Sequence, residues 1–254
     1  MKLEAILTPA ELPSLAGRDL RQTACVVFDI LRATSTFVTG LHHGAREIIP
    51  ASEIAEAVAL RQKRPDALLA GERDGLRIQA AQSGGIDFDL GNSPREFTPE
   101  KIQGQTIIST TTNGTRALRA CASAQTVLAA SFLNLSATAE FLQRTAFAEV
   151  LLVCAGTGDG AALEDILAAG ALANQLSGQH PSPAISDAAE ITRQTFLQAK
   201  NDWKMVFSSS QNARRLLAIP ALSEDVAFCR QEDVFDVVAE MQAGGGIRRL
   251  EHAL

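Results

Sequence analysis

The stretch ACVVFDILRATSTFVTGLHH, residues 24–43, carries the pattern that decides the fold. An apolar run over 24–30 is followed by a polar turn over 32–36 and then by a helical segment over 37–43. Short continuous apolar runs are typical of strands that are buried on both faces of a parallel sheet. The stretch therefore predicts a buried strand, a polar strand-to-helix turn and a helix that packs on the sheet.

The same pattern occurs twice more along the chain. It recurs over 106–121, where the turn reads TTTNGT, and over 150–176, where the turn reads AGTGDG. A helical segment at 53–63 lies among five further expected strands, at 2–7, 47–50, 68–70, 126–129 and 224–229. This alternation predicts a three-layer α/β/α fold with a largely parallel or mixed sheet and helices on both of its faces.

The domain organisation follows from the length and from the loops. A chain of 254 residues allows one or two domains. No long linker divides it, so we expect a single domain over 1–254, with one candidate subdomain boundary near 178–186. The glycine-rich segment 79–94 interrupts the alternation and predicts a loop or an irregular hairpin.

The composition indicates a globular protein and excludes several functions. Hydrophobic residues make up 46% and charged residues 20% of the chain, close to the globular average. The net charge of −6 leaves no basic excess for nucleic-acid phosphates, so we expect no nucleic-acid partner. No apolar stretch approaches the ~20 residues of a membrane helix, and the N-terminal segment does not resemble a signal peptide. We therefore expect a cytoplasmic protein with no membrane contact, and a homodimer as the commonest oligomer.

The cysteines give no sign of a metal site or a disulfide framework. None of the four belongs to a C-x-x-C pair, and the histidines lie far from them in the sequence. We expect buried free thiols at Cys25, Cys121, Cys154 and Cys229.

The polar turns are the first candidates for a binding site, because ligands of parallel α/β sheets bind at the carboxyl ends of the strands. In the second turn, the hydroxyls of Thr111 and Thr112 and the free N–H groups of a helix start could bind an anion. Arg116 adds a guanidinium suited to phosphate or sulfonate. Ordinary helix capping by Thr or Asn is the alternative interpretation.

The third turn, 155–160, resembles a glycine loop that cradles a phosphate. It lacks the third glycine at dinucleotide spacing and the Lys-Ser/Thr of a P-loop, so a nucleotide-dependent enzyme is only an alternative. Glu164 and Asp165 follow in the first turn of the next helix. Carboxylates there complement the helix dipole, or they could hold Mg²⁺, which prefers oxygen ligands.

Asp29 ends the strongly apolar first strand, where a carboxylate is costly unless it is paired or bound to a metal. Arg32 is near enough in the sequence to pair with Asp29, and that ion pair is the structural alternative to a catalytic role. Glu72 and Arg73 repeat the combination of acid and base after an apolar run, although Glu–Arg pairs are also common on surfaces.

Six motifs occur together in one order and spacing: VVFDILRATST (26–36), AGER (70–73), FDLGNSP (88–94), TTTNGTRAL (110–118), ASFLN (130–134), and CAG (154–156) followed by LEDILAAGA (163–171). In these motifs the chain resembles the 2-phosphosulfolactate phosphatase family, most strongly over about residues 24–176. The resemblance implies a three-layer α/β fold and a Mg²⁺-dependent phosphomonoesterase. Such an enzyme would hydrolyse (2R)-2-phospho-3-sulfolactate to 3-sulfolactate and phosphate, for coenzyme M biosynthesis or as a source of sulfolactate.

The polar residues of these motifs form the predicted site. The predicted catalytic residues are Asp29, Arg32, Glu72 and Arg116. The predicted substrate-binding residues are Arg73, Asn92, Ser93, Thr111, Thr112, Asn113 and Gly114. The predicted Mg²⁺ ligands are Asp29, Glu164 and Asp165. The three arginines would offset the phosphate, sulfonate and carboxylate of the small anionic substrate.

No histidine lies in the motifs, so carboxylates would activate the attacking water. The FDILR motif around Asp29 does not match the D-x-D motif of aspartyl-phosphate enzymes, which favours metal-assisted attack by water over a covalent intermediate on Asp29. Two alternative functions stay open: a phosphatase for another small phospho-hydroxyacid, and a non-catalytic protein that binds small anions.

Overall fold

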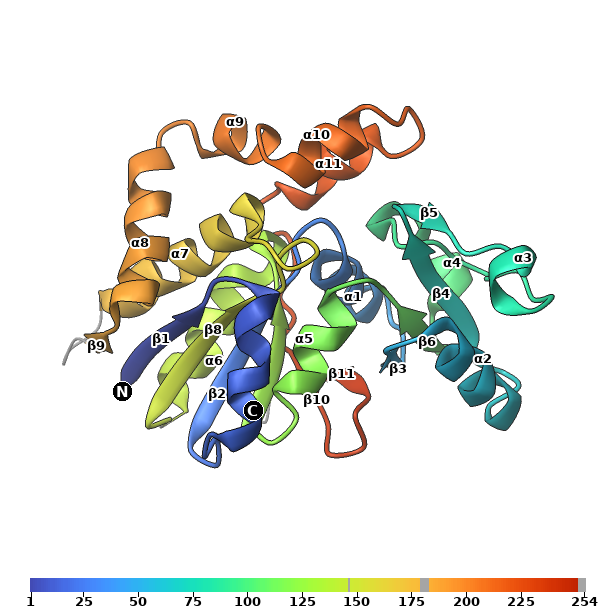
Figure 1. The fold of residues 1–254 in the computed structure, drawn as a ribbon, viewed down its shortest axis with the longest axis horizontal. Helices are drawn as coiled ribbons and strands as arrows, with labels where there is room; N and C mark the ends of the chain where they lie inside the picture. The colour runs from blue at the N-terminus through green and yellow to red at the C-terminus, as the bar shows by residue number, and fades with distance from the viewer. Residues whose placement is uncertain (146, 179–182, 251–254) are drawn as a thin grey trace.

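The computed structural model describes residues 1–145, 147–178 and 183–250. Within these residues a large mixed sheet is covered by helices, in agreement with the predicted α/β/α fold (Figure 1). No described helix is long and apolar enough to cross a membrane. The four cysteines are buried free thiols, as expected.

The secondary structure follows the sequence pattern closely over the first two thirds of the chain. The strands are β1 (Lys2–Ile6), β2 (Thr23–Phe28), β3 (Glu47–Ala51), β4 (Leu68–Arg73), β5 (Leu76–Arg77), β6 (Thr106–Thr110), β7 (Thr126–Ala130), β8 (Glu149–Cys154), β9 (Ala184–Ile185), β10 (Ala239–Met241) and β11 (Ile247–Arg249). The α-helices are α1 (Ala33–His42), α2 (Ile54–Lys63), α3 (Ala80–Ser83), α4 (Pro99–Ile102), α5 (Gly114–Ala120), α6 (Leu135–Arg144), α7 (Leu163–Ser177), α8 (Asp187–Ala199), α9 (Trp203–Ser208), α10 (Gln211–Leu217) and α11 (Ser223–Cys229). The 3-10 helices among the described residues are η1 (Pro9–Gly17), η2 (Pro94–Glu96) and η3 (Phe132–Asn134).

Two groups of parallel strands, β4-β6-β3 and β7-β2-β8-β1-β9, are joined by an antiparallel hairpin, and β5 pairs antiparallel with β4 at one edge of the sheet. Its order is β5-β4-β6-β3-β11-β10-β7-β2-β8-β1-β9. The C-terminal hairpin β10–β11 pairs antiparallel with β7 on one side and with β3 on the other. The hairpin β10–β11 comes late in the chain. It therefore connects two groups of parallel strands that earlier residues form.

Strand β2 shows why the first motif sets the layers. All six of its residues are buried. Val26 and Phe28 pack into the core on the side of α6 and α7, whereas Cys25 and Val27 pack on the side of α1 and α5. An unbroken apolar run is thus what a strand with helices on both faces requires.

Helices α1 and α5 pack between the two groups of strands (Figure 1). Helix α1 contacts β3 and β7, and α5 contacts β2 and β3. Since both helices follow directly after strands, their first residues lie where the carboxyl ends of the two groups converge. This arrangement brings the polar turns of the sequence motifs to one place.

The last third of the chain departs from the sequence prediction. Residues 224–229 were expected to form a strand, but they belong to helix α11, which buries Asp225, Val226 and Cys229 on one face. That spacing of one and four residues fits a helical period, which a short apolar run does not distinguish from a strand. The predicted irregular segment 79–94 is largely correct but contains the short helix α3. Of the boundary expected near 178–186, residues 179–182 lie outside the described residues.

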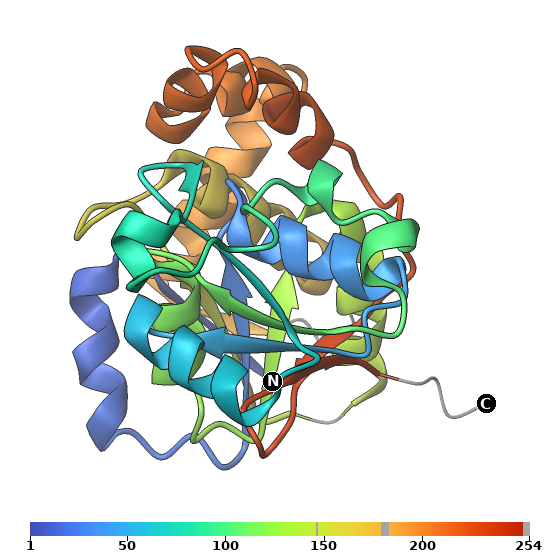
Figure 2. The same ribbon diagram turned by 90° about the vertical axis from the view of Figure 1, so that its right-hand side faces the viewer.

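Helices α9, α10 and α11, residues 203–229, form a helical cap over the molecule (Figures 1 and 2). An aromatic cluster anchors the cap at one end, because Trp203 stacks on Phe132 at a ring distance of 4.3 Å and Phe207 packs edge-on against both rings. The cap lies on the side of the sheet where the polar turns converge.

Candidate active site

A cavity lies between the polar turns and the helical cap. Seven of the predicted site residues line it: Asp29, Arg32, Glu72, Asn92, Thr111, Thr112 and Asn113. These residues come from four motifs that are separated by many residues in the sequence. Residues outside the predicted set complete the wall, among them Asp74, Thr157, Asn212 and Arg215.

Asp29 occupies the turn between β2 and α1. Its Oδ1 accepts a hydrogen bond from the N–H of Ala33 at 3.2 Å. A Cβ atom on Gly114 would lie only 2.6 Å from Asp29 Oδ2 and 2.7 Å from the Cβ of Ala33. Glycine at 114 therefore allows the start of α5 to approach Asp29 closely, so the predicted anion-binding helix start faces a carboxylate of the protein itself.

The environment of Asp29 favours its protonated form. Burial raises the pKa of Asp29 to about 7, and the negative charges of Glu72 and Glu164 act in the same direction. The N–H groups of Ala33 and Gly114 oppose the rise without cancelling it. Near neutral pH, a carboxyl group in this position is stabilised when it binds a proton or a cation.

Glu72 is buried and organises the wall of the cavity. Its Oε1 accepts hydrogen bonds from the N–H and the hydroxyl of Thr112, at 3.2 and 3.0 Å. Its Oε2 accepts a hydrogen bond from the N–H of Gly75 at 2.7 Å. Glu72 thus holds the turn after β6 against the hairpin of β4 and β5.

The adjacent carboxylates Glu164 and Asp165 have different surroundings, and neither lines the cavity directly. Asp165 accepts hydrogen bonds from the N–H groups of Ile30 and Gly156, at 2.8 and 2.9 Å, and so joins the segments that follow β2 and β8. Burial, together with the charges of Glu164 and Asp29, raises the pKa of Asp165 well above its usual range. Glu164 Oε1 accepts a hydrogen bond from Asn212, whereas its buried Oε2 has no hydrogen-bond partner.

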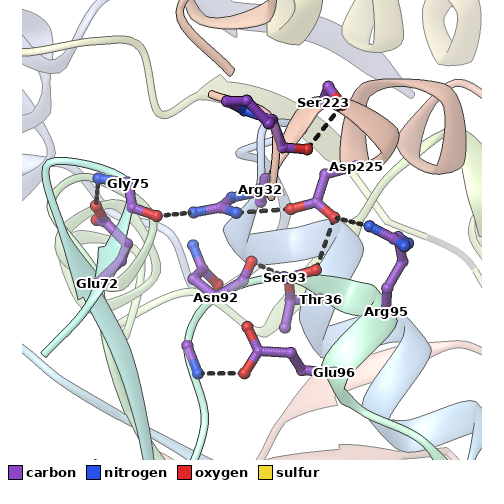
Figure 3. Close-up of polar contacts among 12 residues, drawn as sticks. Arg32, Thr36, Glu72, Gly75, Asn92, Ser93, Arg95, Glu96, Ser223 and Asp225 are labelled. Atoms are coloured by element: carbon purple, nitrogen blue, oxygen red, sulfur yellow. Dashed lines mark hydrogen bonds and ion pairs between the residues drawn. The ribbon is translucent and has the colours of Figure 1, made fainter. Parts of the chain in front are cut away.

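Arg32 joins the cavity wall to the helical cap (Figure 3). Its guanidinium donates to Asp225 of α11 at 2.6 Å and to the carbonyl oxygen of Gly75 at 2.6 Å. Its ion-pair partner is therefore Asp225 rather than Asp29. Ser93 belongs to the same cluster, because its hydroxyl donates to Asp225 at 2.7 Å.

The structure does not bring the other two motif arginines into the cavity wall. Arg73 donates to Thr110 Oγ1 and to the carbonyl oxygen of Glu72. Arg116 is largely exposed, and its Nη1 lies 3.8 Å from the Oδ1 of Asp159. The expected group of three arginines at one substrate is thus reduced to Arg32, whose donors already have partners within the protein.

Two amide side chains of the predicted set also belong to the site. Asn92 lines the cavity, and its buried Oδ1 has no hydrogen-bond partner. Asn113 donates to the carbonyl oxygen of Gly156 at 2.6 Å and fixes the start of α5 against the turn after β8. Because the oxygen and nitrogen of an amide can exchange places by rotation, Asn92 can offer either a donor or an acceptor to a ligand.

Sequence reasoning missed the cavity residues Asp74, Asn212 and Arg215. The dipeptide Asp74-Gly75 is a signal that could have been used, because Asp-Gly is typical of two-residue β-hairpin turns. Asn212 and Arg215 lie in α10, outside every motif, and their local sequence shows only a helix with a serine N-cap. Their place in the site depends on tertiary structure.

Among the described residues, no group of three or more His, Cys, Asp or Glu side chains gathers closely enough to hold a metal ion by itself. The candidate ligands with free capacity are Asp29, which faces the cavity, and Glu164, whose Oε2 is unpartnered. Both oxygens of Asp165 already accept backbone hydrogen bonds.

Comparison with known proteins agrees with the arrangement of the motifs. A family model described as 2-phosphosulpholactate phosphatase matches residues 7–244, which include the whole cavity wall. A protein from Caldanaerobacter subterraneus subsp. tengcongensis named "Probable 2-phosphosulfolactate phosphatase" is 39% identical over 235 residues, or 91% of this chain and 92% of that protein. Proteins of the same name from Thermotoga maritima and Clostridium acetobutylicum are 40% and 30% identical, over 86% and 96% of this chain and 89% and 99% of their own lengths. The chain therefore belongs to the 2-phosphosulfolactate phosphatase family.

Proposed function

We propose that the protein hydrolyses (2R)-2-phospho-3-sulfolactate to 3-sulfolactate and inorganic phosphate, and that it requires Mg²⁺. The observation that carries this proposal is the convergence of motif residues, Asp29, Glu72, Asn92 and the 111–113 turn, on one cavity in a member of this family. The sulfolactate so released would serve coenzyme M biosynthesis or another use of sulfolactate.

The number of available carboxylates, those of Asp29 and Glu164, suits Mg²⁺ better than a cation whose ligands all come from the protein. Mg²⁺ usually binds one or two carboxylates and completes its shell with water and substrate phosphate oxygens. Asp29 and Glu164 would hold it, and their mutual repulsion, which helps to raise the pKa of Asp29, would be relieved. When bound, Mg²⁺ would neutralise charge on the phosphoryl group and lower the pKa of a coordinated water. Asp165 would position the neighbouring turns through its two backbone hydrogen bonds.

The other cavity residues would bind and orient the phosphoryl group. Thr111, Thr112 and Asn92 line the cavity and carry hydroxyl and amide groups. Such fixed dipoles stabilise the charge of a phosphoryl transition state, because most of the catalysis of phosphoryl transfer comes from positioning and electrostatics. Asp29 would hold the attacking water through its carboxylate, which we favour over formation of an aspartyl phosphate.

Phosphate release from a panel of phospho-hydroxyacids, measured with Mg²⁺ and with EDTA, tests the proposal. We expect Mg²⁺-dependent release that is fastest with 2-phospho-3-sulfolactate. Faster turnover of another phospho-hydroxyacid would identify a different substrate. Phosphate or sulfolactate binding that is insensitive to EDTA, without phosphate release, would instead indicate an anion-binding protein. A shift of the melting temperature by ATP or NAD would support a nucleotide-dependent enzyme.

A further inference from the structure

Arg215 and Asp74 face each other at the rim of the cavity. Arg215 lies on α10 of the helical cap and Asp74 lies in the turn between β4 and β5, and both line the cavity. The Nη2 of Arg215 lies 3.1 Å from the Oδ1 of Asp74. The side chains of Arg215 and Asp74 are 50% and 91% exposed. This ion pair therefore links the cap to the hairpin at a solvent-exposed position.

Arg215 is the cavity arginine that a substrate can recruit at little cost. Arg32 is the other guanidinium in the wall, but it is buried and bonded to Asp225 and to the carbonyl oxygen of Gly75. Exposed ion pairs contribute little to stability, because solvent screens them and both side chains lose freedom. Arg215 can therefore exchange Asp74 for an anion in the cavity. Arg32 cannot leave its partners in the same way, because Asp225 would remain buried without its nearest counter-charge.

The hairpin holds Asp74 in a fixed position. Arg73 pairs with Leu76, so Asp74 and Gly75 form a two-residue loop, and both have positive φ angles, of 57° and 83°. These angles are typical of the type I′ turn that favours Asp-Gly. The backbone of Gly75 bonds to Glu72 and to Arg32 on its two sides, which fixes the turn to the cavity wall.

Helix α10 presents two polar side chains to the cavity at positions three residues apart. Residues with this spacing lie on the same face of a helix. Asn212 donates to Glu164 and to Thr157, at 2.7 and 2.6 Å, next to the candidate metal ligands. Arg215 lies at the exposed end of this face, so a ligand that reaches from the carboxylates toward the rim meets its guanidinium.

We propose that Arg215 binds the sulfonate of the substrate and that it leaves Asp74, its partner in the free protein, when the substrate binds. This inference rests on the proposed function, which places the phosphoryl group at Asp29. The carboxylate of the substrate shares a carbon with the phosphate ester, whereas the sulfonate is one carbon further away. The sulfonate is thus the acidic group that reaches furthest toward the rim, where the guanidinium fork can bond two of its oxygens.

The inference is tested by the kinetics of Arg215 variants on three substrates. These are 2-phospho-3-sulfolactate, 2-phospholactate, which lacks the sulfonate, and the phosphate ester of 2-hydroxyethanesulfonate, which lacks the carboxylate. For Arg215→Ala we expect KM to rise about 10- to 100-fold for the two sulfonates, with kcat little changed and KM for 2-phospholactate unaffected. Arg215→Lys should recover part of the loss, because lysine keeps the charge but not the fork.

Two further variants complete the test. Asp74→Asn keeps the turn, because Asn tolerates positive φ, and removes the competing charge, so KM for the sulfonates should fall by up to about 5-fold. Arg214→Ala is the matched control, because Arg214 is the exposed neighbour on the same helix, donates to the carbonyl oxygen of Ser209 and does not line the cavity. Its kinetics should equal those of the wild type.

An unchanged KM for the two sulfonates in Arg215→Ala would overturn the inference. An equal rise in KM for all three substrates would also overturn it, and so would a rise for the two substrates that carry a carboxylate but not for the phosphate ester of 2-hydroxyethanesulfonate. Calorimetric binding of 3-sulfolactate to the same proteins separates this inference from the proposed function. If the wild type releases no phosphate but binds 3-sulfolactate through Arg215, the proposed function fails and the inference stands. If it neither hydrolyses nor binds the sulfonates, both fail.

Discussion

The buried ion pair between Arg32 and Asp225 should control both the stability of the protein and the position of the helical cap. The side chains are 2% and 0% exposed, and the Nη1–Oδ2 distance is 2.6 Å. In Asp225→Ala the guanidinium of Arg32 stays buried without its counter-charge, and the hydroxyl of Ser93 also loses its acceptor. Removal of one partner from a buried pair costs about 3–5 kcal/mol. For a protein of this size, that loss corresponds to a fall in Tm of about 6–20 °C.

Denaturant unfolding followed by circular dichroism measures this loss as a free energy of unfolding. Glu232→Gln is the matched control, because it removes the exposed contact between Lys204 of the cap and Glu232, at 3.6 Å, and should cost less than about 1 kcal/mol. The double variant Arg32→Met with Asp225→Leu should regain most of the stability, because it leaves no unpaired buried charge. If Asp225→Ala loses no more stability than Glu232→Gln, the pair does not anchor the cap and the reasoning is refuted.

Three further predictions concern the carboxylates and the close approach of α5. Glu164→Gln should raise the Mg²⁺ concentration needed for half-maximal phosphate release by about 10-fold or more, because it removes a charged ligand oxygen; an unchanged Mg²⁺ titration would contradict this. Gly114→Ala should lower the free energy of unfolding by about 1–3 kcal/mol, because its Cβ would lie 2.6 Å from Asp29 Oδ2, and a melting temperature equal to that of the wild type would show that the site adapts. The pKa of Asp29 is raised to about 7, so its stabilising contribution is fully present below the unfolded pKa near 4 and is lost as the pH rises through 7. In EDTA, the free energy of unfolding should therefore fall between pH 4 and 7, and it should fall less steeply in Asp29→Asn; equal slopes in the two proteins would argue against the raised pKa.

The sequence predicts the first part of the fold well because local patterns determine it. The apolar run that becomes β2 is buried at every position, and the turn after it carries Asp29 into the cavity. The same reasoning fails at 224–229, where an apolar run forms a helix. The reason lies in tertiary structure, because the partner of Asp225 is Arg32, 193 residues earlier in the sequence.

The sequence predicts which motif residues form the candidate site, but it does not predict which arginines lie there. The motifs identify Glu72 and Asn92 as cavity residues, and the structure brings both into the wall. They also suggest that Arg73 and Arg116 meet the substrate, whereas both arginines contact other parts of the protein. The exposed cation at the cavity is Arg215, which only the packing of the cap brings there.

The central claim is that the motif residues around Asp29 form the centre of a Mg²⁺-dependent phosphatase. The most direct measurement is the rate of phosphate release from 2-phospho-3-sulfolactate by the wild type and by Asp29→Asn, at saturating Mg²⁺. The account predicts rapid release by the wild type and a loss of at least about 100-fold in kcat for the variant, as expected when a group that acts in the reaction is removed. Near-normal turnover by Asp29→Asn would contradict the account.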